Sequence, residues 1–589
     1  MIKKTFLLLL IFLLFVSFIF SSEESIEEKV ERLLSQMTLE EKVGQMTQVD
    51  SSYLYNPEDV KRYFIGSVLS GGNSGPSNPT PANWVEYVNR FQYYALQTRL
   101  RIPILYGIDA VHGNAKVYSA VVFPHNIGLG CTRNEKLVED CARITAIETS
   151  AIGIRWSFAP CVAVVQDVRW GRTYESFSEN PDVVALLGSA VVRGFQGGSL
   201  SNKDSILACP KHFVGDGGTK FGTSINGLLD QGDTRISEKE LRNIHLKPYI
   251  FAIKNSAKSI MVSFSSWNGI KMHANKYLLT DVLKKELGFD GFLVSDWKAI
   301  EQLPGNYEDQ VAMSINAGID MIMVPDNYVR FINTLISCVQ KGRVPISRID
   351  DAVRRILKVK FLLGLFENPY ANKDLINKIG SKEHREVARR AVRESVVVLQ
   401  NKNKILPLSK NLKHICVVGP KANDIGSQCG GWTISWQGQK GNITVGTTIL
   451  EAIKKSVSNN TKVTFSPYGD NIPKDAEVIV AVVGEKPYAE SMGDTFKPEI
   501  EYSDHLILQN IFKEKKPIVM ILLVGRPVDI ENYLSKTFGV ICAWLPGTEG
   551  EGITDILFGD FNPKGRLSFT WYTVDRNKAT FPYGYGLSY

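Results

Sequence analysis

Short apolar runs alternate along the chain with longer segments in which apolar residues recur at helical spacing. Seven such runs precede residue 365, at 65–69, 104–108, 154–158, 206–209, 260–263, 292–295 and 321–324. Strand–helix alternation predicts a parallel sheet with right-handed crossovers. Seven or eight strands in a segment of this size predict a (β/α)8 TIM-like barrel in residues 23–365. The chain of 589 residues is too long for one hydrophobic core, so a second domain is expected.

A second, shorter alternation follows and predicts a separate domain. Its five apolar runs lie at 415–418, 463–465, 478–483, 518–523 and 540–544. They predict an α/β sandwich in residues 401–560. A helical pattern ends near residue 364 at a Gly/Pro-rich stop, so we expect a linker over 366–400. The turn-rich and aromatic tail at 561–589 is expected to pack back onto the body of the protein.

The N-terminus carries the pattern of a secretory signal peptide. Two lysines precede an almost unbroken apolar run over 6–20, and residues 1–22 are therefore expected to be a cleaved leader. This pattern predicts a route through the secretory pathway, to the cell exterior or to a lysosome or vacuole. Asn442 and Asn459 each begin a glycosylation sequon, which matters only on that route.

Composition argues against several classes of protein and site. The net charge of +7 is spread along the chain, so it gives no reason to expect binding to nucleic acid or to a membrane surface. Eight cysteines show neither CxxC nor Cys/His metal spacing, so no metal site is expected. An oxidising compartment would favour one or two disulfides among them. The glycine-rich segment 215–219 lacks the spacing of a phosphate-binding loop.

Polar residues stand at or near the ends of several predicted barrel strands. Because barrel strands direct their carboxyl ends to one face, we expect these side chains to share a pocket. They are Asp109, Arg172, Lys211, His212 and Asp296. Such a set suits the hydroxyl groups of a sugar ring, and Trp297, beside Asp296, offers an apolar face to that ring. For any one of these residues alone, helix capping or an ordinary salt bridge is the simpler explanation.

Two loops of the second domain extend this constellation. The loop after the run 478–483 carries Glu485 and Glu490 and could supply a second carboxylate. A glycine-flanked loop carries Trp432 and Trp436, which either belong to the core or form an exposed clamp that stacks on a ligand.

Eight motifs along the chain are highly specific in combination. They are Gly107-Ile-Asp-Ala-Val-His-Gly113, Arg169-Trp-Gly-Arg-Thr-Tyr-Glu-Ser176, Lys211-His-Phe-Val-Gly-Asp-Gly-Gly-Thr219, Met261-Val-Ser-Phe-Ser-Ser-Trp-Asn-Gly269, Val294-Ser-Asp-Trp297, the Gly430-Gly-Trp432…Trp436 loop, Tyr488-Ala-Glu-Ser-Met-Gly-Asp494 and Phe581-Pro-Tyr-Gly-Tyr-Gly-Leu-Ser-Tyr589. Through these motifs nearly the whole mature chain resembles glycoside hydrolase family 3. It is most similar to two-domain, plant-type exo-β-glucan glucohydrolases and β-glucosidases. The resemblance implies a barrel and an α/β sandwich with the active site between them.

The resemblance also implies a role for each site residue. Asp296 matches the family's nucleophile, and Glu490 matches its acid/base, with Glu485 in the same loop as the alternative. The residues that match those holding the terminal glucose or forming the walls of its pocket are Asp109, Arg172, Lys211, His212, Trp297, Trp432 and Trp436. Phe264 stands where plant members have Tyr, which removes one hydroxyl near the nucleophile.

The predicted activity follows from this resemblance. We expect a retaining, exo-acting β-glucosidase that releases glucose from the non-reducing ends of β-glucosides and β-glucans, without a metal or organic cofactor, since two carboxyls suffice. The alternatives are a β-xylosidase or other β-glycosidase of the same fold and a catalytically inactive glycan-binding protein. Family members that act on N-acetylglucosaminides carry a catalytic His after the Lys-His pair. This chain has no His between Phe213 and Ile244, which argues against that substrate.

Overall fold

The strands of the first domain close into a ring of eight positions. The computed structural model describes residues 24–572 and 578–589, so the predicted leader 1–22 lies outside the described residues. The barrel strands are β1 (Thr47–Asp50), β2 (Ser67–Ser70), β3 (Leu105–Ile108), β4 (Trp156–Ser157), β6 (Ser259–Met261), β9 (Phe292–Val294) and β10 (Ile322–Met323). They pair in parallel in the order β10-β1-β2-β3-β4 and as β6-β9.

Isolated bridges complete this ring. The extended segment 206–213 lies between β4 and β6, because Leu207 bridges Trp156 and Phe213 bridges Val262. A further bridge from β9 to Met321 brings the ring back to β10. The predicted (β/α)8 TIM-like barrel is therefore confirmed.

Strand β1 is absent from the sequence prediction, and its composition explains why. Its residues Thr-Gln-Val-Asp include one aliphatic side chain, yet all four are buried. Two of the polar side chains donate inside the barrel: Thr47 Oγ1 to the Val43 carbonyl at 2.8 Å and Gln48 Nε2 to Ser67 Oγ at 2.8 Å, while Gln48 Oε1 has no partner among the described residues. A buried strand whose hydrogen bonds are internal does not need an apolar run.

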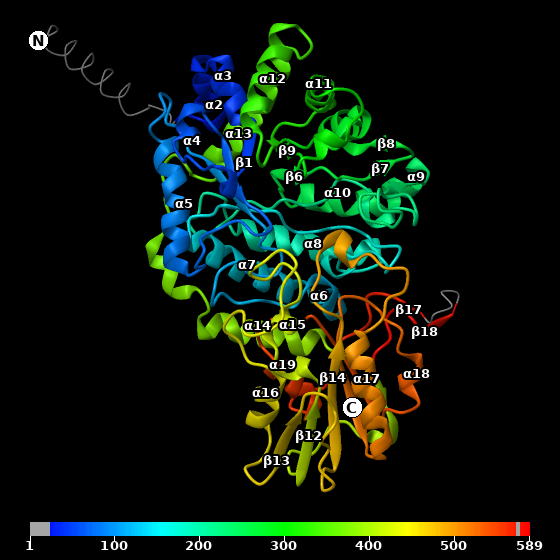
Figure 1. Cartoon of the computed structure of the whole chain (residues 1–589). Coiled ribbons are helices and arrows are strands. Elements are labelled where there is room, and N and C mark those ends of the chain that lie inside the picture. Colours follow the sequence, from blue (N-terminus) through cyan, green and yellow to red (C-terminus); the bar gives the residue numbers. More distant parts are fainter. Residues whose placement is uncertain (1–23, 573–577) are drawn as a thin grey trace, which may run out of the picture.

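Helices surround the barrel strands and cover its outer surface (Figure 1). Those of the first domain are α2 (Ile26–Gln36), α3 (Leu39–Gln45), α4 (Asp59–Arg62), α5 (Pro81–Ala95), α6 (Asn126–Thr132), α7 (Glu135–Ala151), α8 (Pro181–Gln196), α9 (Glu238–Glu240), α10 (Lys247–Lys254), α11 (Tyr307–Ala317), α12 (Tyr328–Gln340) and α13 (Ile346–Leu362). Helix α3 begins at a capping box formed by Thr38 and Glu41. A small sheet of β5 (Asp233–Thr234), β7 (Ser266–Trp267) and β8 (Ile270–Lys271) lies outside the ring.

The second domain is built on a six-stranded sheet with helices on both faces. In spatial order its strands are β11 (Val397–Asn401), β16 (Gly539–Trp544), β15 (Ile518–Leu523), β14 (Val478–Gly484), β12 (His414–Val418) and β13 (Lys462–Ser466). Its helices are α14 (Lys382–Ser395), α15 (Ile425–Cys429), α16 (Ile449–Ser456), α17 (Tyr502–Ile511), α18 (Glu531–Leu534) and α19 (Glu551–Leu557). The predicted α/β sandwich is confirmed, with one strand more than the five apolar runs indicate.

Alternate residues of the central strands enter two different hydrophobic cores. In β14, Val478, Val480 and Val482 pack on one face, in a core that includes residues of α14, α16 and α19. Ile479, Ala481 and Val483 face the other way, toward α17 and toward barrel residues such as Trp170 and Tyr174. Because both faces are covered, the strand is apolar throughout. The second of these cores is shared by the two domains, which lie one above the other in Figure 1.

The range 366–400, expected as a linker, contains regular structure. It holds helix α14 and leads into β11, which pairs antiparallel with β16 at the edge of the sheet. The tail also contacts the sheet, because the Leu587 N–H donates to the Val398 carbonyl at 2.9 Å. The short strands β17 (Trp571–Tyr572) and β18 (Ala579–Phe581) pair with each other.

All eight cysteines lie in the described part of the chain, where each is a buried free thiol. The expectation of one or two disulfides is therefore wrong for this structure. A free cysteine behaves as a small apolar side chain and is usually buried, so these eight are core residues. Within residues 24–572 and 578–589, no helix combines the length and apolarity that crossing a bilayer requires.

A buried lysine ties helix α13 to the bottom of the barrel. Lys360 is fully buried, and its ammonium donates to Gln45 Oε1 at 2.7 Å, the Gly66 carbonyl at 2.8 Å and the Pro103 carbonyl at 2.7 Å. Gly66 directly precedes β2, and Gln45 and Pro103 lie two residues before β1 and β3. Burial lowers the pKa of Lys360 well below its usual value. The contacts replace the water that this polar group loses.

We therefore expect Lys360→Met to lower the melting temperature clearly. The substitution leaves three buried acceptors without a donor, a loss of about 3 kcal/mol. Lys358→Met is the matched control on the same helix, because Lys358 makes only partly exposed ion pairs with Glu27 and Asp290 at 3.4 Å. Its effect should stay within about 0.5 kcal/mol. Equal melting curves for the two variants, recorded by circular dichroism, would refute the role given to Lys360.

Candidate active site

A cavity of about 810 Å³ opens between the barrel and the second domain. Its lining contains every site residue predicted from the sequence. The barrel contributes Asp109, Arg172, Lys211, His212, Phe264, Asp296 and Trp297, and the second domain contributes Trp432, Trp436 and Glu490. Side chains separated by hundreds of residues therefore meet only because the two domains pack together.

Asp296 lies just beyond the carboxyl end of strand β9, on the barrel side of the cavity. Its Oδ1 accepts the Trp297 N–H at 2.7 Å, and its own N–H donates to His273 Nε2 at 3.1 Å. Burial raises the pKa of the Asp296 carboxyl to about 6, although the charges of Arg172 and Lys211 oppose this rise. At neutral pH the group is mostly ionised and faces the cavity.

Glu490 reaches the cavity from the turn η11 (Glu490–Gly493), which lies in the loop after β14. The residue adopts a left-handed backbone conformation, with φ of 53°. Burial raises the pKa of its carboxyl to about 8; Arg172 opposes the rise, while the charges of Asp230 and Asp296 add to it. The two carboxyls of the cavity thus hold protons over different pH ranges, Glu490 more tightly than Asp296.

Arg172 connects the two domains at this point. Its guanidinium donates to Glu490 Oε1 at 3.0 Å and to Glu175 Oε2 at 2.8 Å. Glu175 also accepts the indole N–H of Trp432 at 3.1 Å, so one buried carboxylate orients a cation and an aromatic wall. The sequence prediction did not single out Glu175. The motif 169–176 could have indicated it, because Glu175 lies in that motif three residues after Arg172.

Lys211 and Asp109 form a second buried ion pair in the cavity. Lys211 Nζ donates to Asp109 Oδ1 at 3.1 Å, and the ammonium lies 5.5 Å from the ring centre of Trp432. Their side chains are 2% and 10% exposed, so water screens the pair weakly. A ligand hydroxyl entering here would meet one acceptor and one donor side by side.

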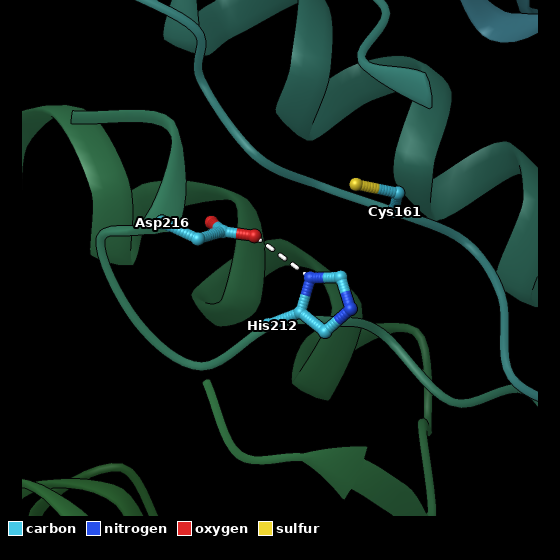
Figure 2. A group of neighbouring side chains, drawn as sticks. All are labelled: Cys161, His212 and Asp216. Atoms are coloured by element: carbon cyan, nitrogen blue, oxygen red, sulfur yellow. Dashed lines mark hydrogen bonds and ion pairs between the residues drawn. The ribbon is translucent and has the colours of Figure 1, made fainter. Parts of the chain in front are cut away.

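His212 is oriented by Asp216, as Figure 2 shows. His212 Nδ1 lies 2.8 Å from Asp216 Oδ2, and Asp216 Oδ1 accepts the Gly217 N–H at 3.0 Å. Burial lowers the pKa of His212 well below its usual value, so the ring is neutral. With Nδ1 as donor to Asp216, Nε2 is left as an acceptor, 3.7 Å from Asp296 Oδ2.

The same two residues and Cys161 bring three possible metal-ligand atoms within 4.8 Å of one another. The hydrogen bond between His212 and Asp216 accounts for the proximity of that pair (Figure 2). Burial raises the pKa of the Cys161 thiol to about 12. His212 and Asp216 are thus held together by their own hydrogen bond, and Cys161 lies beside them as a buried, neutral thiol.

Aromatic side chains form the apolar walls of the cavity. Trp432 is 4% exposed and belongs to the shared core, whereas Trp297, Trp436 and Phe264 are half-buried. Stacking of Trp436 on a ligand stays a prediction. Gly71, in the loop after β2, makes room for the Trp297 indole, because a Cβ there would lie 3.1 Å from the ring.

Glu485, the alternative second carboxylate, lies elsewhere in the interface. It accepts from Arg526 Nε at 2.9 Å, from the Tyr488 hydroxyl at 3.0 Å and from the Gly525 N–H at 2.9 Å. Each carboxylate oxygen is thus occupied by protein donors. Glu485 is not among the described residues that line the cavity.

Two unequal carboxyls in a cavity with aromatic walls and paired cations define the site of a glycoside hydrolase. Comparison with known families agrees with this class. Residues 38–359 match the glycosyl hydrolase family 3 N-terminal domain, and residues 396–589 match the family's C-terminal domain. The chain belongs to glycosyl hydrolase family 3.

Individual relatives cover almost the whole chain. A lysosomal β-glucosidase of Dictyostelium discoideum is 35% identical over 95% of this chain and 76% of its own length. A β-xylosidase of Formosa agariphila is 29% identical over 97% of this chain and 80% of its own length. The crystal structure of an exo-1,3/1,4-β-glucanase from a Pseudoalteromonas species has a TM-score of 0.90 at 40% identity, covering 96% of this chain and 74% of that chain.

Proposed function

We propose that this protein is a retaining, exo-acting β-glucosidase that releases glucose from the non-reducing ends of β-glucosides and β-glucans. One observation carries the proposal: two carboxyls from two domains line one cavity, and their surroundings give them different proton affinities. A retaining glycosidase needs this division, since one carboxylate attacks while the other carboxylic acid donates a proton. The names of the Dictyostelium and Pseudoalteromonas relatives support a β-glucoside as substrate.

Asp296 serves as the nucleophile and Glu490 as the acid/base. In the first step an Asp296 oxygen bonds to the anomeric carbon while the glycosidic C–O bond breaks, and the leaving oxygen takes the Glu490 proton. In the second step the Glu490 carboxylate removes a proton from water, and the water oxygen displaces Asp296 from the sugar. Two displacements restore the β configuration.

The remaining polar residues hold the terminal glucose. Asp109, Lys211 and Arg172 offer charge-assisted hydrogen bonds to its hydroxyls, and His212 Nε2 offers an acceptor beside the nucleophile. The indoles of Trp297, Trp432 and Trp436 supply flat apolar faces for the C–H faces of the sugars. Phe264 adds an apolar contact without a hydroxyl.

The pH dependence of kcat/KM should be bell-shaped, with limbs near pH 6 and pH 8. As pH falls below about 6, Asp296 gains a proton and loses its nucleophilicity. As pH rises above about 8, Glu490 loses the proton that it must donate. Hydrolysis of an aryl glucoside at constant ionic strength measures both limbs. Glu490→Ala should abolish the alkaline limb, and its persistence would assign that limb to another group.

Substitution of the three carboxylates tests the roles directly. Asp296→Ala should abolish turnover of every substrate. Glu490→Ala should lower kcat/KM by about 10²- to 10⁴-fold for poor leaving groups, much less for activated ones, and azide should partly rescue turnover. Glu485→Ala removes the acceptor of Arg526, Tyr488 and Gly525, so any loss should be smaller than that of Glu490→Ala, and the alkaline limb should remain. A Glu485→Ala variant with the larger azide-rescued loss and no alkaline limb would reverse the assignment.

A 2-fluoro-glucoside distinguishes the enzyme from an inactive glycan-binding protein. The fluorine slows both displacement steps, and an activated leaving group such as dinitrophenolate speeds the first, so the glycosyl-enzyme should accumulate with the label on the peptide that contains Asp296. Mass spectrometry of the digested protein locates it. An unlabelled protein that still binds glycans would be the inactive alternative.

The similarity to the Formosa β-xylosidase makes a β-xyloside the second candidate substrate. A xyloside lacks the hydroxymethyl group of glucose, so a site that holds this group should favour the glucoside in kcat/KM. Matched nitrophenyl glucoside and xyloside, measured side by side, decide between the two. A preference for the xyloside would make the protein a β-xylosidase of the same mechanism.

The sequence features also support passage through the secretory pathway. The leader pattern over 1–22 precedes the folded body, and one similar protein is named as lysosomal. Both sequon asparagines, Asn442 and Asn459, are exposed on the second domain. Glycans at these two positions would therefore not disturb the folded structure.

A further inference from the structure

The loop that carries Glu490 is held to the barrel by a carboxylate four residues further on. Asp494 Oδ1 accepts the Gly171 N–H at 2.8 Å. Its Oδ2 accepts the N–H groups of Leu229 at 3.0 Å and of Asp230 at 2.8 Å. One side chain of the second domain therefore binds three backbone amides from two separate barrel loops.

The two backbones are in direct contact beside this carboxylate. A Cβ on Gly171 would lie 1.9 Å from the Glu490 carbonyl oxygen and 2.8 Å from Gly493. The Thr495 N–H donates to the Arg169 carbonyl at 3.1 Å. The turn Glu490–Gly493 thus begins and ends against the same barrel loop, which also carries Arg172, the partner of the Glu490 carboxyl.

Further contacts hold the turn from the side of the second domain. Arg526 donates to the Gly493 carbonyl at 2.6 Å and to the Arg169 carbonyl at 3.1 Å, and Glu485 holds Arg526 at 2.9 Å. Before the turn, the Tyr174 hydroxyl of the barrel donates to the Tyr488 carbonyl at 2.6 Å. These groups fix the flanks of the turn, whereas Asp494 binds the barrel loops nearest to the Glu490 carboxyl.

We propose that Asp494 is the positioning residue of the acid/base: by binding the amides of Gly171, Leu229 and Asp230 it sets where the Glu490 carboxyl stands relative to the barrel-borne nucleophile. The proposal rests on the acid/base role of Glu490. It assigns Asp494 no contact with substrate, and it explains why the turn ends in a carboxylate that faces backbone donors of the other domain.

The same contact also orders Asp230. Its backbone amide is bound by Asp494, and its carboxyl accepts the Trp170 indole N–H at 2.9 Å. Asp230 is buried next to the cavity, close enough to Arg172 and Glu490 for its charge to act on both. Asp494 therefore fixes the position of the acid/base and of one of the charges that surround it.

Loss of the Asp494 contacts should slow proton donation by Glu490 without slowing the attack of Asp296. A shift of about 1 Å in a catalytic group costs up to about 100-fold in rate. A misplaced Glu490 would slow proton donation to a poor leaving group, whereas an activated leaving group departs without that proton. Asp296, just beyond the end of strand β9 in the barrel, makes no contact with Asp494 and would keep its place.

The test uses the full chain with Asp494→Asn and Asp494→Glu. Asparagine removes the charge and replaces one acceptor oxygen by a donor, and glutamate keeps the charge but lengthens the contact by one methylene. For both variants we expect kcat/KM for a β-linked glucose disaccharide to fall by about 10- to 100-fold. The value for dinitrophenyl glucoside should stay within about 3-fold, and azide should partly rescue turnover. Titration of active sites with a 2-fluoro-glucoside corrects every rate for misfolded protein.

Glu179→Gln is the matched control. Glu179, a carboxylate of the barrel domain, accepts the Thr570 N–H at 2.9 Å and the Thr570 hydroxyl at 2.7 Å, so it too joins distant segments through a backbone amide. It is not among the described residues lining the cavity. We expect its disaccharide and dinitrophenyl rates to change together, if at all.

Two results would overturn the proposal. One is an unchanged ratio of disaccharide to dinitrophenyl rates in both Asp494 variants after active-site correction. The other is a ratio that shifts equally in Glu179→Gln. Glu490→Ala, assayed in parallel, separates the premise from the inference: if it shows selective loss and azide rescue while the Asp494 variants do not, only the positioning role fails. If neither Asp494 variant yields folded protein, Gly171→Ala takes their place. Its Cβ would lie 1.9 Å from the Glu490 carbonyl oxygen and so displace the same turn. It must reproduce the selective loss, and a uniform loss refutes the proposal.

Discussion

The pairing of Arg172 with carboxylates from both domains is the interaction on which the site depends. A buried guanidinium needs partners, because it cannot shed its charge by losing a proton. Glu175 supplies one from the same loop, and Glu490 supplies the other from across the interface. Docking of the two domains therefore also assembles the cavity. The contact between Arg172 and Glu490 brings the Glu490 carboxyl into the cavity that Asp296 lines.

Close backbone approach makes this docking specific. Gly171 stands where a Cβ would lie 1.9 Å from the Glu490 carbonyl oxygen of the other domain, and Gly431 where a Cβ would lie 2.4 Å from the Tyr174 hydroxyl of the barrel. The shared apolar core supplies non-directional attraction between the domains. The glycine contacts and the amides bound by Asp494 then select one relative position, which an apolar surface alone would not do.

Sequence reasoning reached the fold class and the cavity residues because both leave periodic or motif-level signals. It missed β1, whose polar residues are buried by internal hydrogen bonds rather than by apolarity. It placed a linker where α14 and β11 lie, since a helix and an edge strand after a Gly/Pro stop resemble a connection. Glu175 was overlooked because its importance lies in a partner from the other domain, Trp432, and no local spacing predicts that contact. The predicted secretory route led us to expect disulfides, but the eight cysteines are free thiols buried in the packed interior.

The division of the carboxyls between two domains also explains how their proton affinities can differ. Arg172 lowers the pKa of both groups, so it cannot distinguish them. The difference comes from the other neighbours. The Trp297 N–H and Lys211 lower the pKa of Asp296, with Asp109 opposing them, whereas Glu490 meets the carboxylates of Asp230 and Asp296. A nucleophile set among barrel cations stays ionised, and an acid brought against barrel carboxylates keeps its proton. Each acquires the form that it needs only when the domains are docked, because the charges that raise the proton affinity of Glu490 belong to the barrel.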